Sequence, residues 1–77
     1  MKVVLKEIPV GKSGKVTDYE GGVNFRLRLN KLGLHKGDTV KIKRNSRFSG
    51  PVIVEAMGRE IAVGRGIAER IFMEIAE

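Results

Sequence analysis

The sequence predicts a mainly β fold: a small, highly curved barrel of five to six short strands, one short helix at about residues 25–32 and a helical turn near residues 67–70. Two observations lead to this prediction. Short runs of β-favouring residues, several of them alternating apolar and polar, recur along the chain and are separated by turn-forming residues. A single segment longer than one turn has apolar residues at helical spacing. Short strands at such intervals are typical of small barrels.

The first part of the chain contains two candidate strands. Residues 1–8 mix apolar and charged side chains and read as a lead-in strand that Pro9 ends. Residues 10–14 are rich in turn-forming residues. Residues 15–20 alternate, with Val16 on one face and Thr17 and Tyr19 on the other, which predicts a strand ending at the Gly21-Gly22 pair.

A short helix should follow, with Asn24 as its N-cap residue. Phe25, Leu29 and Leu32 have the spacing of one helix face, and burying each should contribute about 1.5–3 kcal/mol. We therefore expect this helix to belong to the core, with Leu29 and Leu32 closing one opening of the barrel. Gly33 comes directly after the last turn, where helices often end in a left-handed residue, so its φ should be positive.

The second part of the chain predicts the remaining strands. Gly37-Asp38 supplies a turn, after which residues 39–43 alternate as a strand. Residues 44–51 form a polar loop, and the β-branched run at 52–57 pairs with residues 60–64 through a turn at Gly58-Arg59. A single helical turn at 67–70 precedes a last strand, in which Ile71, Met73 and Ile75 share one face.

Length and composition limit what the chain can be. Seventy-seven residues form one small domain, residues 1–77, and the absence of cysteine excludes disulfides and thiolate metal sites. The apolar run at the N-terminus ends at Lys6, too early for a signal peptide, and no run approaches the ~20 residues of a membrane-spanning helix. We therefore expect a soluble, cytoplasmic protein.

The net charge of +6 is concentrated in the middle of the chain. Residues 26–47 carry eight Lys and Arg residues against one acid, Asp38, whereas residues 48–77 carry three basic and five acidic residues. A basic centre of this kind favours an anionic partner, which could be a nucleic acid, an anionic membrane face or an acidic protein surface. A solvated face that keeps the protein soluble is the alternative interpretation.

Sequence motifs for catalysis or cofactors are incomplete. Gly11-Lys12-Ser13 lacks the earlier glycine of a phosphate-binding loop, and Gly64-Arg65-Gly66 lacks the third glycine and the βαβ unit of a dinucleotide site. His35 is the one histidine, with Asp38 as its nearest carboxylate, whereas a metal site usually needs several convergent ligands. We predict no enzyme, no cofactor and no metal ligand set.

The basic segment 41–48 is the best candidate for nucleic-acid binding, because single-strand binders combine a cationic groove with stacking aromatic rings. Phe48 is the one aromatic residue in the segment. Lysines at alternate positions also keep an exposed strand soluble, and we favour that interpretation.

An ordered set of motifs resembles the FeoA family. The most distinctive is Arg28-Leu29-x-x-Leu32-Gly33-Leu34-x-x-Gly37-x-x-Val40. Further matches are Gly11-x-x-Gly14-x-Val16, Gly50-Pro51-x-Ile53-x-Glu55, Gly58-x-x-Ile61-Ala62-Val63 and the closing segment 64–71. Together these pieces cover nearly the whole chain in order. The family often has proline before Gly37, where this chain has Lys36, and proline there would only stiffen the turn.

The resemblance implies an SH3-like barrel and a non-enzymatic role in ferrous iron transport. FeoA proteins accompany the FeoB ferrous iron transporter, so the implied partner is the cytoplasmic part of a FeoB-type transporter, through which iron enters the function. Related domains form the C-terminal module of some DtxR-type metal-dependent repressors. A stand-alone relative of that module, or a basic nucleic-acid-binding barrel, are the competing hypotheses.

The charge asymmetry and the resemblance together predict a partner-binding surface and a structural set. The partner-binding residues are Arg26, Arg28, Lys31, Lys43 and Phe48. The structural residues are Leu29, Leu32, Gly33 and Gly37.

Overall fold

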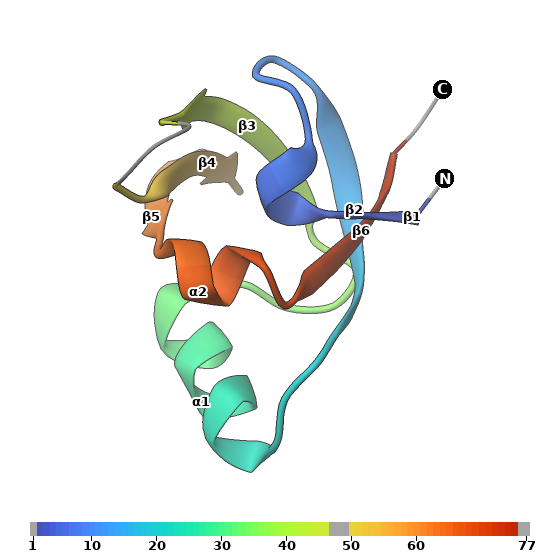
Figure 1. Cartoon of the computed structure of the whole chain (residues 1–77), viewed down its shortest axis with the longest axis vertical. Helices are drawn as coiled ribbons and strands as arrows, with labels where there is room; N and C mark the ends of the chain where they lie inside the picture. The colour runs from blue at the N-terminus through green and yellow to red at the C-terminus, as the bar shows by residue number, and fades with distance from the viewer. Residues whose placement is uncertain (1, 47–49, 76–77) are drawn as a thin grey trace.

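Six antiparallel strands form one curved sheet in the computed structural model, which describes residues 2–46 and 50–75 (Figure 1). The elements are β1 (Lys2–Val4), the 3-10 helix η1 (Leu5–Glu7), β2 (Ser13–Tyr19), α1 (Val23–Leu32), β3 (Thr39–Asn45), β4 (Val52–Ala56), β5 (Arg59–Val63), α2 (Arg65–Ala68) and β6 (Ile71–Ile75). The strand order is β1-β6-β2-β3-β4-β5. This mainly β, SH3-like architecture confirms the predicted fold class.

The interior of the curved sheet holds an apolar core. The alternation that predicted the strands is the alternation of burial: Val40 and Ile42 of β3 are buried between exposed neighbours, as are Ile71 and Met73 of β6 beside half-buried Phe72. Every other element that borders the interior contributes apolar side chains. The remaining buried apolar residues are Leu5, Ile8, Val16, Phe25, Leu29, Leu34, Val52, Val54, Ala56, Ile61, Val63 and Ala68.

Helix α1 lies at one end of the molecule, below the strands in Figure 1, with α2 between it and the sheet. Phe25 and Leu29 are buried, and Leu32 is partly buried against the same core. Helix α1 begins at Val23, two residues earlier than predicted, and the prediction of Asn24 as its N-cap is wrong. Gly22 holds that position, and its carbonyl accepts a hydrogen bond from the Arg26 N–H, which places Asn24 within the first turn.

The end of α1 has the geometry that the sequence predicts. Gly33 has φ 88° and ψ 22°, and its N–H lies 3.0 Å from the carbonyl oxygens of both Leu29 and Asn30. The next turn brings Gly37, at φ 93°, close enough to β2 for its N–H to bond the Val16 carbonyl at 2.7 Å. The end of α1 at Gly33 and the turn at Gly37 together direct the chain into β3.

Several element boundaries differ from the predictions. The β4–β5 turn consists of Met57 and Gly58, so Arg59 is already in β5, because both turn residues have the positive φ that tight hairpins need. Arg44 and Asn45 extend β3 into the predicted loop, and α2 occupies 65–68 rather than 67–70. The lead-in segment is divided between β1 and η1.

Side-chain hydrogen bonds tie the end of β3 to two helical segments. The Asn45 amide donates to the Lys6 carbonyl oxygen at 2.8 Å. Arg65 of α2 donates to the Asn45 side-chain oxygen at 3.4 Å and also bonds the Ser46 carbonyl. Asn45 can join η1 and α2 because its side-chain amide has both a donor nitrogen and an acceptor oxygen.

Candidate partner-binding surface

Helix α1 has a second apolar stripe on the side opposite the core. Each residue turns the helix by about 100°, so Val23 and Leu27 share a face directly opposite Phe25 and Leu29. Val23 is 64% exposed and Leu27 is 51% exposed. A helix that buries one apolar face and exposes another presents a surface suited to a further contact.

Three cations flank the exposed stripe. Arg26 lies along one edge of the Val23–Leu27 pair, while Lys31 and Arg28 lie along the other, as the helical spacing requires. All three side chains are exposed. We call these five residues the outer face of α1.

The cations of the outer face form no ion pair with any described residue, unlike many of those on the strands. Two further cations near α1, Arg59 at its C-terminal end and Arg70 above Phe25, also lack an acidic partner in the described parts of the chain. The helix end of the molecule therefore carries uncompensated positive charge.

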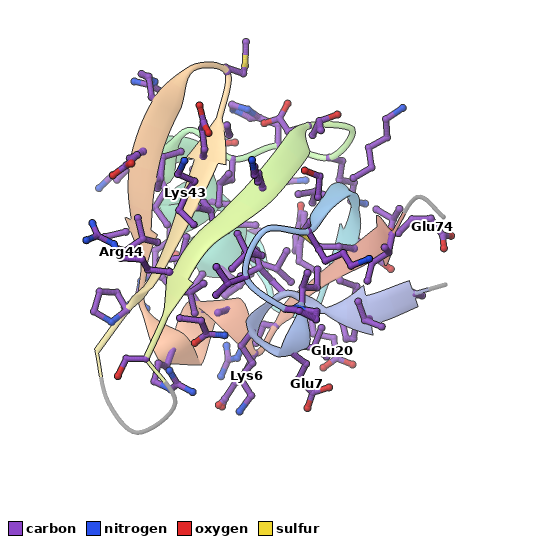
Figure 2. All side chains as sticks on the ribbon, turned by 90° about the horizontal axis from the view of Figure 1, so that it is seen from above. Lys6, Glu7, Glu20, Lys43, Arg44 and Glu74 are labelled. Atoms are coloured by element: carbon purple, nitrogen blue, oxygen red, sulfur yellow. The ribbon has the colours of Figure 1, made fainter. Side chains whose placement is uncertain are left out.

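Several cations in other parts of the molecule have acidic partners, either on a neighbouring strand or between η1 and the end of α2. Lys43 lies 3.7 Å from Glu55, Arg44 lies 4.0 Å from Glu60, and Lys6 lies 3.8 Å from Glu69. The β3 register shifts between Ile42 and Arg44, so that Lys43 and Arg44 project as exposed neighbours with acids on β4 and β5 in reach. Figure 2 shows Lys43 and Arg44 together on the opposite side of the view from Glu74.

The structure therefore divides the predicted partner-binding residues. Arg26, Arg28 and Lys31 lie on α1, whereas Lys43 lies on β3 and has an acidic partner. Phe48 lies outside the described residues. Sequence reasoning missed Val23 and Leu27, although their i, i+4 spacing opposite the core residues was a readable signal. It also missed Arg70, which reaches α1 only through the folding of the chain.

In the loop between α1 and β3, Asp38 and His35 form a contact that belongs to the local structure of the turn. The Asp38 Oδ2 atom accepts the His35 backbone N–H at 2.8 Å and lies 3.4 Å from His35 Nδ1. Within residues 2–46 and 50–75, no three His, Asp or Glu side chains converge as a metal-binding group. The pair stabilises the turn that precedes β3.

Asp18 is the centre of a second exposed charge cluster. Its Oδ1 atom accepts the Tyr19 backbone N–H at 2.8 Å, and Lys36 and Lys2 lie 3.7 and 3.9 Å from its carboxylate. This hydrogen bond, together with the attraction of the two ammonium groups, lowers the pKa of Asp18 below its ordinary value of 3.8. Lys36 also covers the Tyr19 ring, with Nζ 5.1 Å from the ring centroid.

No helix among the described residues is long and apolar enough to cross a membrane. The six-stranded antiparallel sheet and its element order define a small SH3-like domain. The chain belongs to the FeoA family, since the model of the FeoA domain matches residues 3–75. It is accordingly a member of a family related to ferrous iron transport.

Individual relatives agree with this assignment. A protein of Methanocaldococcus jannaschii that carries the provisional name Fe(2+) transport protein A is 37% identical over 67 residues, covering 87% of this chain and 79% of that protein. The crystal structure of an iron uptake regulatory protein (FeoA) has a TM-score of 0.92 at 33% identity, over 99% of this chain and 100% of that one.

A manganese-dependent transcriptional repressor has the same fold in part of its chain. Its TM-score is 0.89 at 14% identity, and the match covers 97% of this chain and 42% of the repressor. At that identity the likeness is one of fold alone. It shows that part of this longer repressor chain has the same fold as the whole of the present domain.

Proposed function

We propose that this chain is a non-enzymatic, cytoplasmic accessory protein of ferrous iron transport that binds the cytoplasmic part of a FeoB-type transporter. Family membership supports the transport context. The observation that carries the proposal is the outer face of α1, where exposed Val23 and Leu27 lie among cations that have no acidic partner in residues 2–46 and 50–75.

This surface has the chemistry of a protein-docking site. Exposed apolar side chains at the centre of a patch supply binding energy when a partner excludes water from them. The surrounding Arg26, Arg28 and Lys31 would attract an acidic surface and orient it during encounter. Lys43 is left out of the proposed contact, because Glu55 already satisfies it on a different part of the molecule.

A nucleic-acid partner is less well supported. Single-strand binders stack bases on open aromatic rings. Here Phe25 is 6% exposed, Lys36 covers Tyr19, and Lys2 lies 5.0 Å from the centroid of the Phe72 ring. The described rings are thus occupied by the protein's own side chains, which favours a protein partner.

The test is a binding titration of the full chain against the isolated cytoplasmic domain of a FeoB-type transporter. The variant Arg26→Glu/Arg28→Glu should weaken binding by about tenfold or more, since it reverses charge beside the apolar stripe. The matched control is Lys12→Glu/Lys15→Glu, which alters two exposed cations of the η1–β2 loop and β2.

Both double variants lower the net charge from +6 to +2, so they share any non-specific electrostatic effect. The control should weaken binding by no more than about threefold. Equal losses in the two variants would exclude the outer face of α1 as the contact. A parent protein that does not bind the transporter domain would refute the proposed function itself.

A further inference from the structure

A shallow notch of about 300 Å³ separates α1 from α2, beside the outer face of α1. Figure 1 shows the two helices as neighbours below the sheet. Two segments about 40 residues apart in the sequence line the notch. None of the described residues that line it is acidic. Its lining residues are Phe25, Arg28, Gly64, Gly66, Ile67 and Arg70.

Two arginines face this notch without an acidic partner in the described parts of the chain. Arg28 and Arg70 are both exposed, and neither forms an ion pair there. The Arg70 guanidinium carbon lies 5.6 Å from the centroid of the Phe25 ring, so that ring helps to hold the guanidinium. Glu20 is joined to Arg70 through its backbone N–H, but its carboxylate forms no ion pair with a described residue.

The other lining groups combine an apolar surface with open space. Ile67 is half-buried and packs against the core, and it supplies an apolar wall beside Phe25. A Cβ added at Gly64 or Gly66 would meet no atom within 4 Å. A ligand can therefore approach the backbone of α2 closely.

We propose that this notch receives an aspartate or glutamate side chain of a partner protein, flanked by an apolar residue that rests on Ile67. Arginine binds carboxylates through two parallel hydrogen bonds, and two arginines at one site select strongly for an anion. The small volume suits one or two side chains rather than a cofactor. The inference deepens the proposed function, because it names the group by which the transporter would be held.

The first experiment uses a defined probe in place of the transporter. The full chain is titrated by amide NMR with a short capped peptide of alternating leucine and glutamate, and separately with its glutamine counterpart. Shifts should concentrate at Phe25, Arg28, Gly66 and Ile67, and the glutamine peptide should bind at least about fivefold more weakly.

Three results would overturn the inference in this experiment. The first is equal binding of the glutamate and glutamine peptides, and the second is a set of shifts centred on β3 instead of the notch. The third is tighter binding of inorganic phosphate than of the glutamate peptide at the same residues, which would make the notch a phosphate site.

The second experiment compares variants that keep the fold and the charge. Arg28→Lys retains the positive charge but loses the planar fork, so peptide affinity should fall by about fivefold. Arg44→Lys on β3 is the matched control and should change affinity by less than about twofold, because Arg44 is exposed and lies outside both the notch and the outer face of α1.

Filling the notch provides an independent variant. Gly66→Leu places a side chain into open space and should abolish detectable peptide binding while leaving the melting temperature unchanged or slightly higher. Undiminished binding by a folded Gly66→Leu protein would show that the peptide binds elsewhere and would end the proposal.

The same variants separate this inference from the proposed function. If the transporter domain binds the parent and Arg28→Lys equally well, the notch is not the contact, while the proposed function stands. If the transporter domain does not bind at all but the glutamate peptide does, the notch inference stands and the acidic partner is a different protein.

Discussion

Two features favour glycine at position 33: the left-handed backbone conformation at the end of α1 and the close approach of the Arg59 side chain. The Gly33 φ of 88° is a conformation that costs an L-residue energy, and it lets two helix-end carbonyls share its N–H. A Cβ added there would lie 2.7 Å from Nη2 of Arg59, the first residue of β5. The lack of a side chain at Gly33 therefore allows both the left-handed conformation that ends α1 and the close approach of the β4–β5 hairpin.

Gly33→Ala should lower the free energy of unfolding by about 1–2 kcal/mol, measured by urea denaturation, because alanine is strained at positive φ. Gly66→Ala is the control, since its position is open and its φ is not in the left-handed region. It should be neutral or stabilise by up to about 1 kcal/mol.

The Arg59 contact can be separated from the backbone strain with a double-mutant cycle. Arg59→Ala should recover only a small part of the loss caused by Gly33→Ala, because a flexible guanidinium can move aside whereas φ cannot. Full recovery would show that crowding, and not backbone conformation, explains the glycine.

Asp18 makes a contribution to the stability of the fold that varies with pH in the acidic range. Because the folded-state pKa of Asp18 is lowered, its stabilising effect is present above the ordinary value of 3.8 and is lost as the pH falls through the folded-state value. Asp18→Asn keeps an oxygen that can accept the Tyr19 N–H but removes the charge.

We expect the melting temperature of Asp18→Asn to lie below that of the parent at neutral pH and to converge with it as the pH falls below the ordinary value of 3.8 and through the lowered folded-state pKa. Thermal unfolding monitored by circular dichroism between pH 2 and pH 7 measures this difference. A gap that stays constant over the whole range would show that the charge of Asp18 contributes nothing.

Among the structural elements, α1 has two apolar sides with different tasks. Leu29, 2% exposed, anchors the helix in the core, whereas Leu27, 51% exposed, faces away from it. The two leucines differ in position by two residues and in environment almost completely. Helix α1 thus contributes to the core at one end of the molecule and also carries the surface proposed to meet the partner.

Leu29→Ala should cost about 2–5 kcal/mol of stability, because it removes buried methyl groups and leaves a cavity. Leu27→Ala should change stability by less than about 0.5 kcal/mol and yet weaken binding to the transporter domain. Chemical denaturation and the binding titration measure the two effects. Unimpaired binding by Leu27→Ala would remove the apolar stripe from the proposed contact.

For the molecule as a whole, the positive charge alone does not identify a partner. The net charge of +6 should give weak, salt-sensitive attraction to any polyanion. With the described aromatic rings covered, we expect a single-stranded DNA oligonucleotide to show no saturable binding at physiological salt, as measured by fluorescence anisotropy. Saturable binding there would favour the nucleic-acid hypothesis.

Much of the fold could be predicted because local signals agree with the final structure. Alternation at Val40 and Ile42 and the glycine at position 33 carry their structural meaning in a few neighbouring residues. The predicted start of α1 was wrong because asparagine is strongly favoured at the N-cap position, which led to the choice of Asn24. Glycine is also accepted there, and Gly22, with an extended backbone, is the N-cap residue.

The candidate site was harder to predict because it depends on distant contacts. The bulge in β3 decides that Lys43 meets Glu55, and no local pattern reveals that register. Arg28 and Arg70 border one notch although 41 residues separate them in the chain. Charge counting found the basic helix, but only the folded structure distinguishes compensated from uncompensated cations.

The pairing of β1 with β6 has a consequence for how this fold can be reused. Lys2 lies opposite Glu74 in the register, and Figure 1 shows β1 and the end of β6 on one side of the molecule, away from α1. A domain fused at either end would emerge beside β6 and leave the helix surface uncovered. The fold is therefore suited to being joined to other domains in one chain, which accords with its match to 42% of a longer repressor chain.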